Sequence, residues 1–392
     1  MPRHLRIAEV APPLEPVPPP AYGGTERIIG ELARELHERG HEVTTFAAGD
    51  STVPGRLVAT VPAALWPASF VGDPAPWFVA TIGTVLDHAA EFDVIHSHLE
   101  WYSPILARVS PVPVVTTLHG RLDVPWAGRL IDPDRGRYVA ISAAQAAIQP
   151  AVAWAAVIHN GLSLVESPFD QRHGDDLCFV GRISPEKGVV DAIEVALRTG
   201  RTLRIAAKSG KSELERSYLE AVFRPAVERA GSAVEWLGEL TRAERDRLLV
   251  GSRATLMTGA WPEPFGLVAI ESMACGTPVV ARRVGALPEI VRDGVDGFLG
   301  DDVDELVAGV GRVGDLDRAA IRTSVLDRFS AARMTDAYED LFLRVVAGGD
   351  DATGGTQSSE VGAEGTARPL AAVGGLNGGS DPGSATGGRG RG

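Results

Sequence analysis

The chain has 392 residues, 44% hydrophobic and 23% charged, a globular composition long enough for two domains. A net charge of −13 argues against a general nucleic-acid binder, because neutralising phosphates needs a basic face. Cys178 and Cys275 lie far apart, no apolar run approaches the length of about 18–20 residues that spans a membrane, and the N-terminus lacks a signal peptide's apolar region. These features exclude disulfide-rich, secreted, fibrous and integral-membrane classes and predict a cytoplasmic protein.

Short apolar runs alternate with amphipathic stretches over the first 349 residues, which predicts an α/β protein with parallel sheets. In the first half we expect helices at Thr25–Arg39 and Thr81–Glu91. The strands expected there are Leu5–Val10, His41–Phe46, Asp93–His96, Val112–Leu118, Tyr138–Ile141 and Ala156–Ile158. Because ligands bind at the carboxyl ends of parallel strands, residues that follow strands are the candidates for a site.

The segment after the first strand contains Gly23 and Gly24 and opens a helix. Two glycines let the backbone approach a ligand closely, and a helix start favours an anion. A plain turn with Thr25 as the helix cap explains the segment equally well. The dinucleotide fingerprint Gly-x-Gly-x-x-Gly is absent.

Three histidines lie near strand ends of the first half. His96 and His98 form a His-x-His pair that invites a metal interpretation, but no third ligand of clear spacing follows, so a structural role is favoured. His119 ends a strand and precedes a glycine, which predicts that it lines a cleft.

A polar segment, His159–Asp176, separates this half from a second series of strands and indicates a linker. The strands expected in the second half are Leu177–Gly181, Leu203–Ala207, Val234–Leu237, Ala254–Met257, Pro278–Ala281 and Phe298–Leu299. Apolar residues at helical spacing predict a last helix over Arg333–Val346. Beyond it, the Gly-, Ser-, Ala- and Thr-rich tail is predicted to be disordered.

Arg182 and Lys187 share one glycine-flanked loop after the first strand of the second half. A planar guanidinium and a point charge suit a diphosphate, although a solvated charged turn is an equal alternative. The order of a Walker loop is missing.

The strongest signal is the segment from Glu263 to Glu271, in which Pro264 and Gly266 place the start of an apolar helix between two carboxylates. A carboxylate on an apolar helix is costly unless it is satisfied. Free N–H groups at a helix start bind phosphates, and carboxylates bind hydroxyl groups. Two carboxylates with a helix start between them therefore suit a ligand that carries hydroxyl groups on both sides of its phosphates. That is the layout of a nucleotide-diphosphate sugar.

Together these segments resemble glycosyltransferase family 4, a group of retaining GT-B enzymes, over about residues 5–345. The most specific element is Glu-x7-Glu at Glu263 and Glu271. Supporting segments are Val180-Gly181-Arg182 with Lys187-Gly188, Asn160-Gly161, Gly285–Val291, Gly294 with Gly297-Phe298, Tyr22–Glu26 and Gly40–Val43. The resemblance implies two Rossmann-like domains facing each other across a cleft, with a C-terminal helix that crosses back to the first domain.

The resemblance also implies a role for each candidate residue. Arg182 and Lys187 would hold the donor diphosphate, and Glu271 would take the ribose hydroxyls. Glu263 would contact the transferred sugar, and His119 would touch that sugar at the reacting centre. The catalytic set is therefore His119, Glu263, Arg182 and Lys187, and the donor-binding set is Gly23, Gly24, Arg182, Lys187, Glu263, Phe265, Gly266, Leu267 and Glu271.

The implied function is a retaining, metal-independent hexosyltransferase that uses a UDP- or GDP-linked sugar as co-substrate, with no cofactor. The acceptor is a sugar, a lipid-linked molecule or a small molecule, and nucleic acid is not expected as a partner. Aromatic residues within 65–78 and basic residues within 121–137 could form an acceptor patch or a peripheral contact with the inner face of a membrane. Alternatives are an epimerase of the same fold and a non-catalytic protein that binds nucleotide sugars.

These expectations divide the chain into five parts. An N-terminal Rossmann-like domain on the acceptor side (1–160) is followed by a linker (161–176). A C-terminal Rossmann-like domain on the donor side (177–330) is followed by a helix that returns to the first domain (331–349) and by a disordered tail (350–392).

Overall fold

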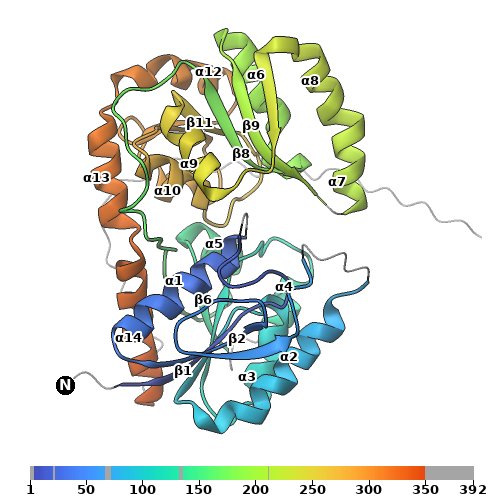
Figure 1. Ribbon diagram of the computed structural model, residues 1–392, viewed down its shortest axis with the longest axis vertical. Coiled ribbons are helices and arrows are strands. Elements are labelled where there is room, and N and C mark those ends of the chain that lie inside the picture. The colour runs from blue at the N-terminus through green and yellow to red at the C-terminus, as the bar shows by residue number, and fades with distance from the viewer. Residues whose placement is uncertain (1–3, 21–22, 67–71, 132–135, 211, 349–392) are drawn as a thin grey trace, which may run out of the picture. The chain divides into compact units, whose positions relative to one another are not determined.

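The computed structural model describes residues 4–20, 23–66, 72–131, 136–210 and 212–348. Within these ranges the chain is an α/β protein with two sheets, and every strand pairing in both is parallel (Figure 1). This confirms the predicted fold class. The described residues all fall in one compact unit, Met1–Gly354. The predicted domain boundaries stay predictions, and the predicted disordered tail lies outside the described residues.

The first sheet has the strand order β3-β2-β1-β4-β5-β6-β7, a doubly wound arrangement. Its strands are β1 Arg6–Val10, β2 Glu42–Ala48, β3 Arg56–Val61, β4 Val94–Ser97, β5 Val114–Leu118, β6 Arg137–Ala140 and β7 Trp154–Val157. The six strands predicted for this half are present. The edge strand β3 was not predicted, although Leu57–Ala59 is apolar, because no helix separates it from β2 and it departs from the expected alternation of strands and helices.

The second sheet has the order β10-β9-β8-β11-β12-β13. Its strands are β8 Leu177–Ile183, β9 Leu203–Ser209, β10 Val234–Gly238, β11 Ala254–Met257, β12 Val279–Arg282 and β13 Gly297–Gly300. Each corresponds to a predicted strand. Continuous apolar runs identify such strands because helices cover both faces of a parallel sheet.

Helices follow most strands, although β3 follows β2 and β8 follows β7 with no helix in the described residues between them. Those of the first half are α1 Gly24–Glu38, α2 Ala75–His88, α3 Ser103–Val109, α4 Ala127–Leu130 and α5 Ala143–Ile148. Those that follow are α6 Val189–Thr199, α7 Glu213–Tyr218, α8 Arg224–Ala230, α9 Arg242–Gly251, α10 Leu267–Ala274, α11 Leu287–Ile290, α12 Val303–Arg312, α13 Arg318–Arg328 and α14 Ala331–Val346. The helix expected at Thr81–Glu91 begins earlier, at Ala75, because Pro74 and Pro76 suit a helix start, and its end tightens into a 3-10 turn.

The C-terminal helix α14 returns to the first sheet, as predicted. In Figure 1 α13 lies beside the second sheet, and α14 continues from it to lie beside α1. Arg39 at the end of α1 donates a 2.9 Å hydrogen bond to Glu339 of α14. The Tyr338 hydroxyl of α14 lies 2.8 Å from Thr117 Oγ1 of β5.

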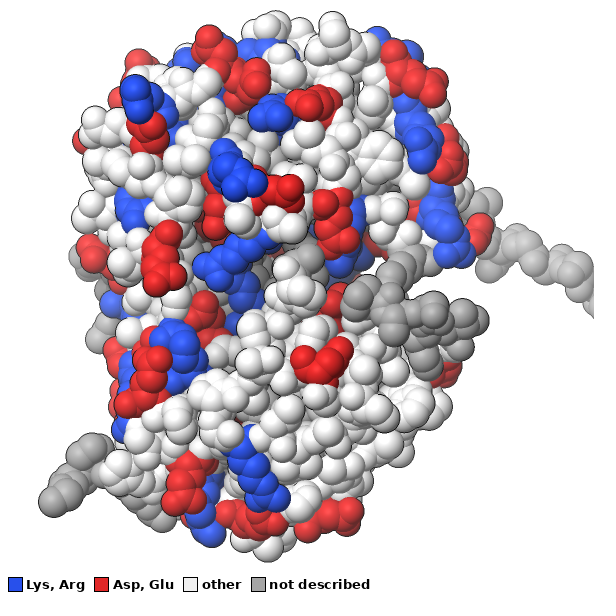
Figure 2. Space-filling view, in the orientation of Figure 1, with Lys and Arg blue, Asp and Glu red and all other residues white. Residues whose placement is uncertain are grey.

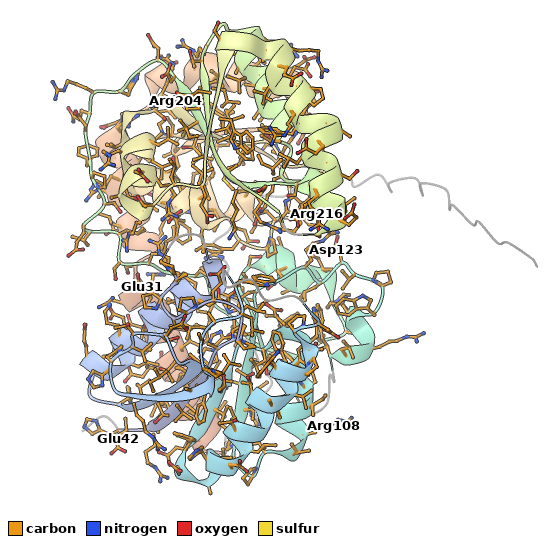
Figure 3. The ribbon with its side chains drawn as sticks, turned by 45° about the vertical axis from the view of Figure 1, so that its right-hand side comes forward. Glu31, Glu42, Arg108, Asp123, Arg204 and Arg216 are labelled. Atoms are coloured by element: carbon orange, nitrogen blue, oxygen red, sulfur yellow. The ribbon has the colours of Figure 1, made fainter. Side chains whose placement is uncertain are left out.

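One buried apolar cluster extends across both halves. It contains Ile28 and Leu32 of α1, Phe342 of α14, and Ile270 and Met273 of α10. The linker region is also anchored to the first half, since Ser163 Oγ donates a 2.5 Å hydrogen bond to Glu31 of α1, a residue labelled in Figure 3. The two halves of the chain are therefore joined by a shared apolar core.

Helices long and apolar enough to cross a membrane are not found in the part of the chain that the structure describes. Acidic and basic side chains are interspersed over the face shown in Figure 2.

Candidate active site

A cavity of about 480 Å³ lies between the carboxyl ends of the two sheets. Its lining includes every site residue predicted from the sequence: Gly23, Gly24, His119, Arg182, Lys187, Glu263, Phe265, Gly266, Leu267 and Glu271. The structure thus brings together segments that are up to 248 residues apart, from Gly23 to Glu271. Ligand binding at this position is typical of doubly wound sheets.

The start of α10 forms part of the cavity wall. Gly266 precedes the helix with φ of 100°, in the left-handed region that glycine adopts readily. A Cβ atom there would lie 3.1 Å from the Leu287 side chain. This glycine lets the backbone turn into α10, so that Phe265, Gly266 and Leu267 line the cavity.

Lys187 and Glu263 form an ion pair at the cavity wall. The Lys187 ammonium donates a 2.6 Å hydrogen bond to Glu263 Oε2, and it lies 4.5 Å from the centroid of the Trp261 ring. Both charged side chains are more than four-fifths buried. Their charges therefore interact in a partly desolvated site, where electrostatic effects are stronger than in water.

Arg182 lies on the same side of the cavity. Its guanidinium donates to Glu215 at 2.7 Å and to Glu186 at 3.3 Å, and 37% of its side chain is exposed. Arg182 belongs to β8 and not to the loop that the sequence predicted for it, because its backbone pairs with β9. The loop that follows β8 ends at Gly188, where φ is 66° and a Cβ atom would lie 2.6 Å from the Thr258 carbonyl oxygen. Only glycine fits this turn, which holds the loop against the end of β11.

Glu271 is paired with two arginines that the sequence analysis missed. Arg27 of α1 and Arg245 of α9 both donate to its Oε1, the latter at 2.9 Å. Burial opposes ionisation of Glu271, but the two guanidinium groups outweigh it and lower the pKa of this carboxyl. The only available signal was that a buried acid on an apolar helix needs a counterion.

His119 is held from two directions at the end of β5. Its ring Nε2 lies 2.8 Å from His98 Nδ1, and its backbone N–H donates a 2.9 Å hydrogen bond to Glu100 Oε1. Desolvation lowers the pKa of His119 to about 3, so its ring is neutral near pH 7. Glu100 has φ of 49°, unusual for a residue other than glycine, and desolvation raises its pKa to about 7.

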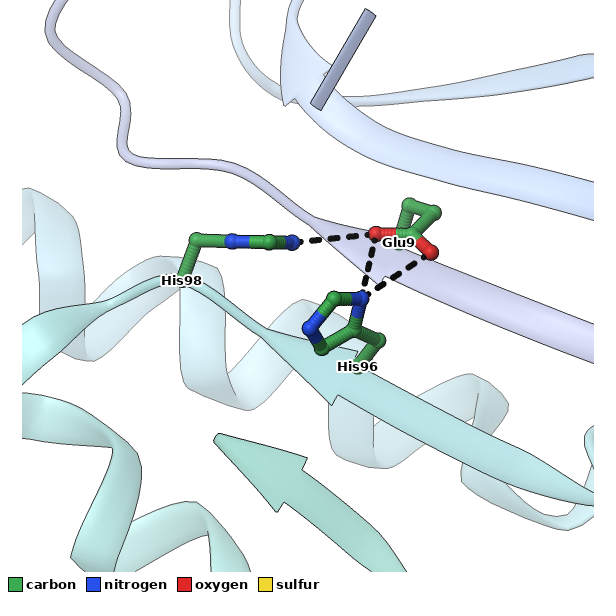
Figure 4. Close-up of side chains that lie close together, drawn as sticks. All are labelled: Glu9, His96 and His98. Carbon is green, nitrogen blue, oxygen red and sulfur yellow. Dashed lines mark hydrogen bonds and ion pairs between the residues drawn. The ribbon is translucent and has the colours of Figure 1, made fainter. Parts of the chain in front are cut away.

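A third potential ligand, which the sequence analysis did not find, lies beside His96 and His98, so their structural role stays a prediction. Both are fully buried and lie 3.1 Å from carboxylate oxygens of Glu9 in β1 (Figure 4). Glu9 could not be recognised from the sequence as the partner of the two histidines, because it lies 87 residues before His96. The three potential ligand atoms lie within 4.8 Å of one another, and each takes part in these hydrogen bonds.

The first-sheet side of the cavity carries further acidic and aromatic groups. Glu15, Glu26 and Glu100 line it together with Trp66 and Phe78. Burial raises the pKa of Glu26 to about 7. Trp66 and Phe78 belong to the aromatic stretch predicted as an acceptor patch, so the structure places part of that stretch at the cavity.

Both halves of the chain match known families. Residues 22–164 match the family described as Glycosyltransferase Family 4, and residues 171–317 match Glycosyl transferases group 1. The chain is 30% identical to a D-inositol 3-phosphate glycosyltransferase of Mycolicibacterium paratuberculosis, over 87% of this chain and 90% of the relative. It is 28% identical to a glycogen synthase of Mycobacterium tuberculosis, over 82% of this chain and 89% of the relative.

A similar solved structure is that of HepE from Anabaena in complex with UDP-glucose. It is 19% identical to this chain, with a TM-score of 0.67 over 88% of this chain and 100% of that one. This likeness supports the fold.

Proposed function

The chain belongs to the family 4 glycosyltransferases, and on that premise we propose that it is a retaining enzyme that transfers a hexose from a UDP- or GDP-linked sugar to an acceptor hydroxyl. The observation that carries this proposal is the single cavity in which Arg182, Lys187 and Glu271 of the second half face Gly24 and His119 of the first.

The donor would lie along the second-sheet wall. The diphosphate would bind Arg182 and Lys187, beside the start of α10, and the ribose hydroxyls would bind Glu271. The transferred sugar would then lie between Glu263 and His119. This order is the one that the family resemblance implies, and both carboxylates can accept hydrogen bonds from hydroxyl groups.

In the transfer, the bond from the anomeric carbon to the diphosphate oxygen breaks and the acceptor oxygen bonds to that carbon on the same face. The nucleoside diphosphate leaves, and the acceptor's proton is released. Negative charge grows on the leaving diphosphate, where Arg182 and Lys187 are already in place to stabilise it. Positive charge grows on the sugar ring, which the Glu263 carboxylate favours.

We also propose that the reaction needs no divalent cation, because these cationic groups supply positive charge at the leaving diphosphate. Turnover should therefore survive EDTA. Loss of activity on chelation, restored by magnesium or manganese, would contradict this part of the proposal.

The acceptor would approach along the first-sheet wall, where carboxylates and the Trp66 ring suit a molecule rich in hydroxyl groups. The names of the relatives, a glycogen synthase and a D-inositol 3-phosphate glycosyltransferase, indicate acceptors of different kinds. A sugar, a lipid-linked molecule and a small polyol are therefore all to be tested.

The test is a donor panel with measurement of released UDP, GDP and ADP, with and without an acceptor mixture. We expect one nucleotide class to support slow hydrolysis alone and faster release with acceptor. Proton NMR of the product should show the anomeric configuration of the donor. An inverted anomer would refute retention, and binding without any release would favour the alternative of a non-catalytic nucleotide-sugar protein. The epimerase alternative is not favoured, since the relatives are transferases or synthases by name.

A further inference from the structure

A continuous chain of hydrogen bonds leads from the cavity into the core of the first half. It begins at His119, passes through His98 to Glu9, and continues through His96 and Thr117 to Tyr338 of α14. His98 lies 2.8 Å from His119 through its Nδ1 atom and 3.1 Å from Glu9 through its Nε2 atom. His96 lies 3.1 Å from Glu9 through its Nδ1 atom and 2.8 Å from Thr117 through its Nε2 atom. Glu9, His96 and His98 have 0% exposure, so solvent does not complete their hydrogen bonds.

Glu9 determines which nitrogen of His98 carries the proton. With Glu9 ionised, its carboxylate can only accept hydrogen bonds, so His98 Nε2 and His96 Nδ1 would both donate to it (Figure 4). A neutral imidazole has one N–H group. His98 Nδ1 is therefore an acceptor.

The same reasoning extends to His119. The 2.8 Å contact between His98 Nδ1 and His119 Nε2 needs one proton between the two nitrogens. Because His98 Nδ1 is the acceptor, the proton must belong to His119 Nε2. The Nδ1 atom of His119 is then unprotonated, and no hydrogen bond to it is found among the described residues.

We propose that His98, oriented by Glu9, is a positioning residue that holds His119 as its Nε2–H tautomer and thereby presents Nδ1 to the cavity as a hydrogen-bond acceptor. On the proposed function, that nitrogen accepts a hydrogen bond from a hydroxyl of the transferred sugar. His119 then serves to orient the sugar and does not act as a proton donor.

Desolvation supports the neutral state of the two rings. It lowers the pKa of both His98 and His119 to about 3. For Glu9, burial raises the pKa, and the hydrogen bond from His98 opposes that shift. A protonated Glu9 would instead donate to one ring, and donation to His98 would reverse the tautomers of both His98 and His119. The proposal therefore makes a definite statement about where two protons lie.

The first test is NMR of the full chain labelled with 15N-histidine, with His98 and His119 assigned by substitution. We expect both rings to show a protonated Nε2 and an unprotonated Nδ1 at neutral pH. A protonated Nδ1 on either ring would overturn the proposal. This readout needs neither donor nor acceptor, so it stands apart from any failure of the proposed transfer reaction.

The second test compares substitutions at the two buried histidines. His98→Leu removes the acceptor for His119, whereas His98→Asn places an amide oxygen near the position of Nδ1. His96→Leu is the matched control, because His96 is equally buried and touches Glu9 but makes no hydrogen bond to His119. We expect His98→Leu to lower kcat at least tenfold with donor KM within twofold, and His98→Asn to recover part of kcat.

The control separates positioning from packing. His96→Leu should lower the melting temperature as much as His98→Leu does, yet keep the His119 tautomer and kcat within twofold. Equal losses of kcat in the two leucine variants would show that the histidines matter only for stability. Should a leucine variant fail to fold, the NMR result on the unsubstituted chain still decides the tautomer.

Discussion

At the scale of single residues, the two carboxylates of the Glu-x7-Glu segment differ in their surroundings. Glu263 is bound to one lysine, and Glu271 is bound to two arginines that approach from different elements. The first pair lies where the sugar is proposed to react. The second lies where the unreactive ribose is proposed to bind. Substitutions at these positions should therefore affect different kinetic constants.

Glu271→Gln should raise the donor KM and leave kcat within twofold, because contacts to the ribose are equal in ground and transition states. A hydrogen bond to a charged group contributes about 1.5–3 kcal/mol, which corresponds to a rise in KM of roughly 10- to 150-fold. The variant should also melt at a lower temperature, because Arg27 and Arg245 lose their anionic partner. Steady-state kinetics and thermal unfolding measure both effects. A fall in kcat at unchanged KM would contradict the ribose assignment.

Lys187→Ala and Glu263→Gln should each lower kcat more than they change KM, because both residues face charge that develops only in the transition state. A double-mutant cycle on this pair checks whether they act together. Since the two side chains are in contact, we expect the double variant to lose less than the product of the single losses. A rise in KM alone for either single variant would indicate plain ground-state binding.

At the scale of elements, the sequence predicted the parts of the site that depend on local order. Arg182 lies at the carboxyl end of β8, Lys187 lies beyond that strand, and Glu263 lies beyond β11, so the carboxyl-end rule placed them together. The interactions of Glu9 with His98 and of Arg27 with Glu271 could not be predicted, because they join residues 89 and 244 positions apart and depend on how the elements pack. The strand β3 was not recognised because it follows β2 without an intervening helix, which departs from the expected alternation.

Tyr338→Phe tests how α14 is fastened to the first sheet. The change removes the hydroxyl that lies 2.8 Å from Thr117 and keeps the ring packed against His96. Loss of one buried hydrogen bond should lower the free energy of unfolding by about 1–2 kcal/mol. Denaturant unfolding measures this, with kcat expected within twofold of the wild type. A large loss of kcat would mean that the hydrogen-bond chain transmits its effect further than His98.

At the scale of the whole molecule, buried histidines and buried glutamates change the stability of the fold in opposite directions as the pH falls. His96, His98 and His119 have pKa values lowered to about 3 by burial, so the unfolded chain takes up protons there below about pH 6.5 and acid destabilises the fold. Burial raises the pKa of Glu26 and Glu100 to about 7, so the folded chain holds protons there that the unfolded chain has lost. These carboxyls destabilise the fold as the pH rises from 4.5 to about 7.

Glu26→Gln should remove the destabilisation that the buried Glu26 carboxyl causes as the pH rises. At pH 5 the folded chain already holds Glu26 protonated, so the variant should melt close to the wild type. The variant should become progressively more stable than the wild type up to about pH 7 and stay so above it, by at most about 3 kcal/mol. Thermal unfolding at pH 5, 6, 7.5 and 8.5 measures the difference. A difference that does not change with pH would show that Glu26 keeps an ordinary pKa in the folded protein.

The salt bridge from Arg27 to Glu271 joins α1 of the first half to α10 of the second across the cavity. If Glu271 binds the ribose, an incoming nucleotide must compete for it with Arg27, which already pairs with Glu271 and belongs to the same chain. Tethering gives Arg27 a high effective concentration that dilution cannot lower. The measured affinity for a nucleoside diphosphate should then be weaker than its own contacts would provide, by the fraction of time that Arg27 leaves Glu271 free. Because this factor is the same for every ligand that uses Glu271, substitution of Arg27 would strengthen the binding of all of them together.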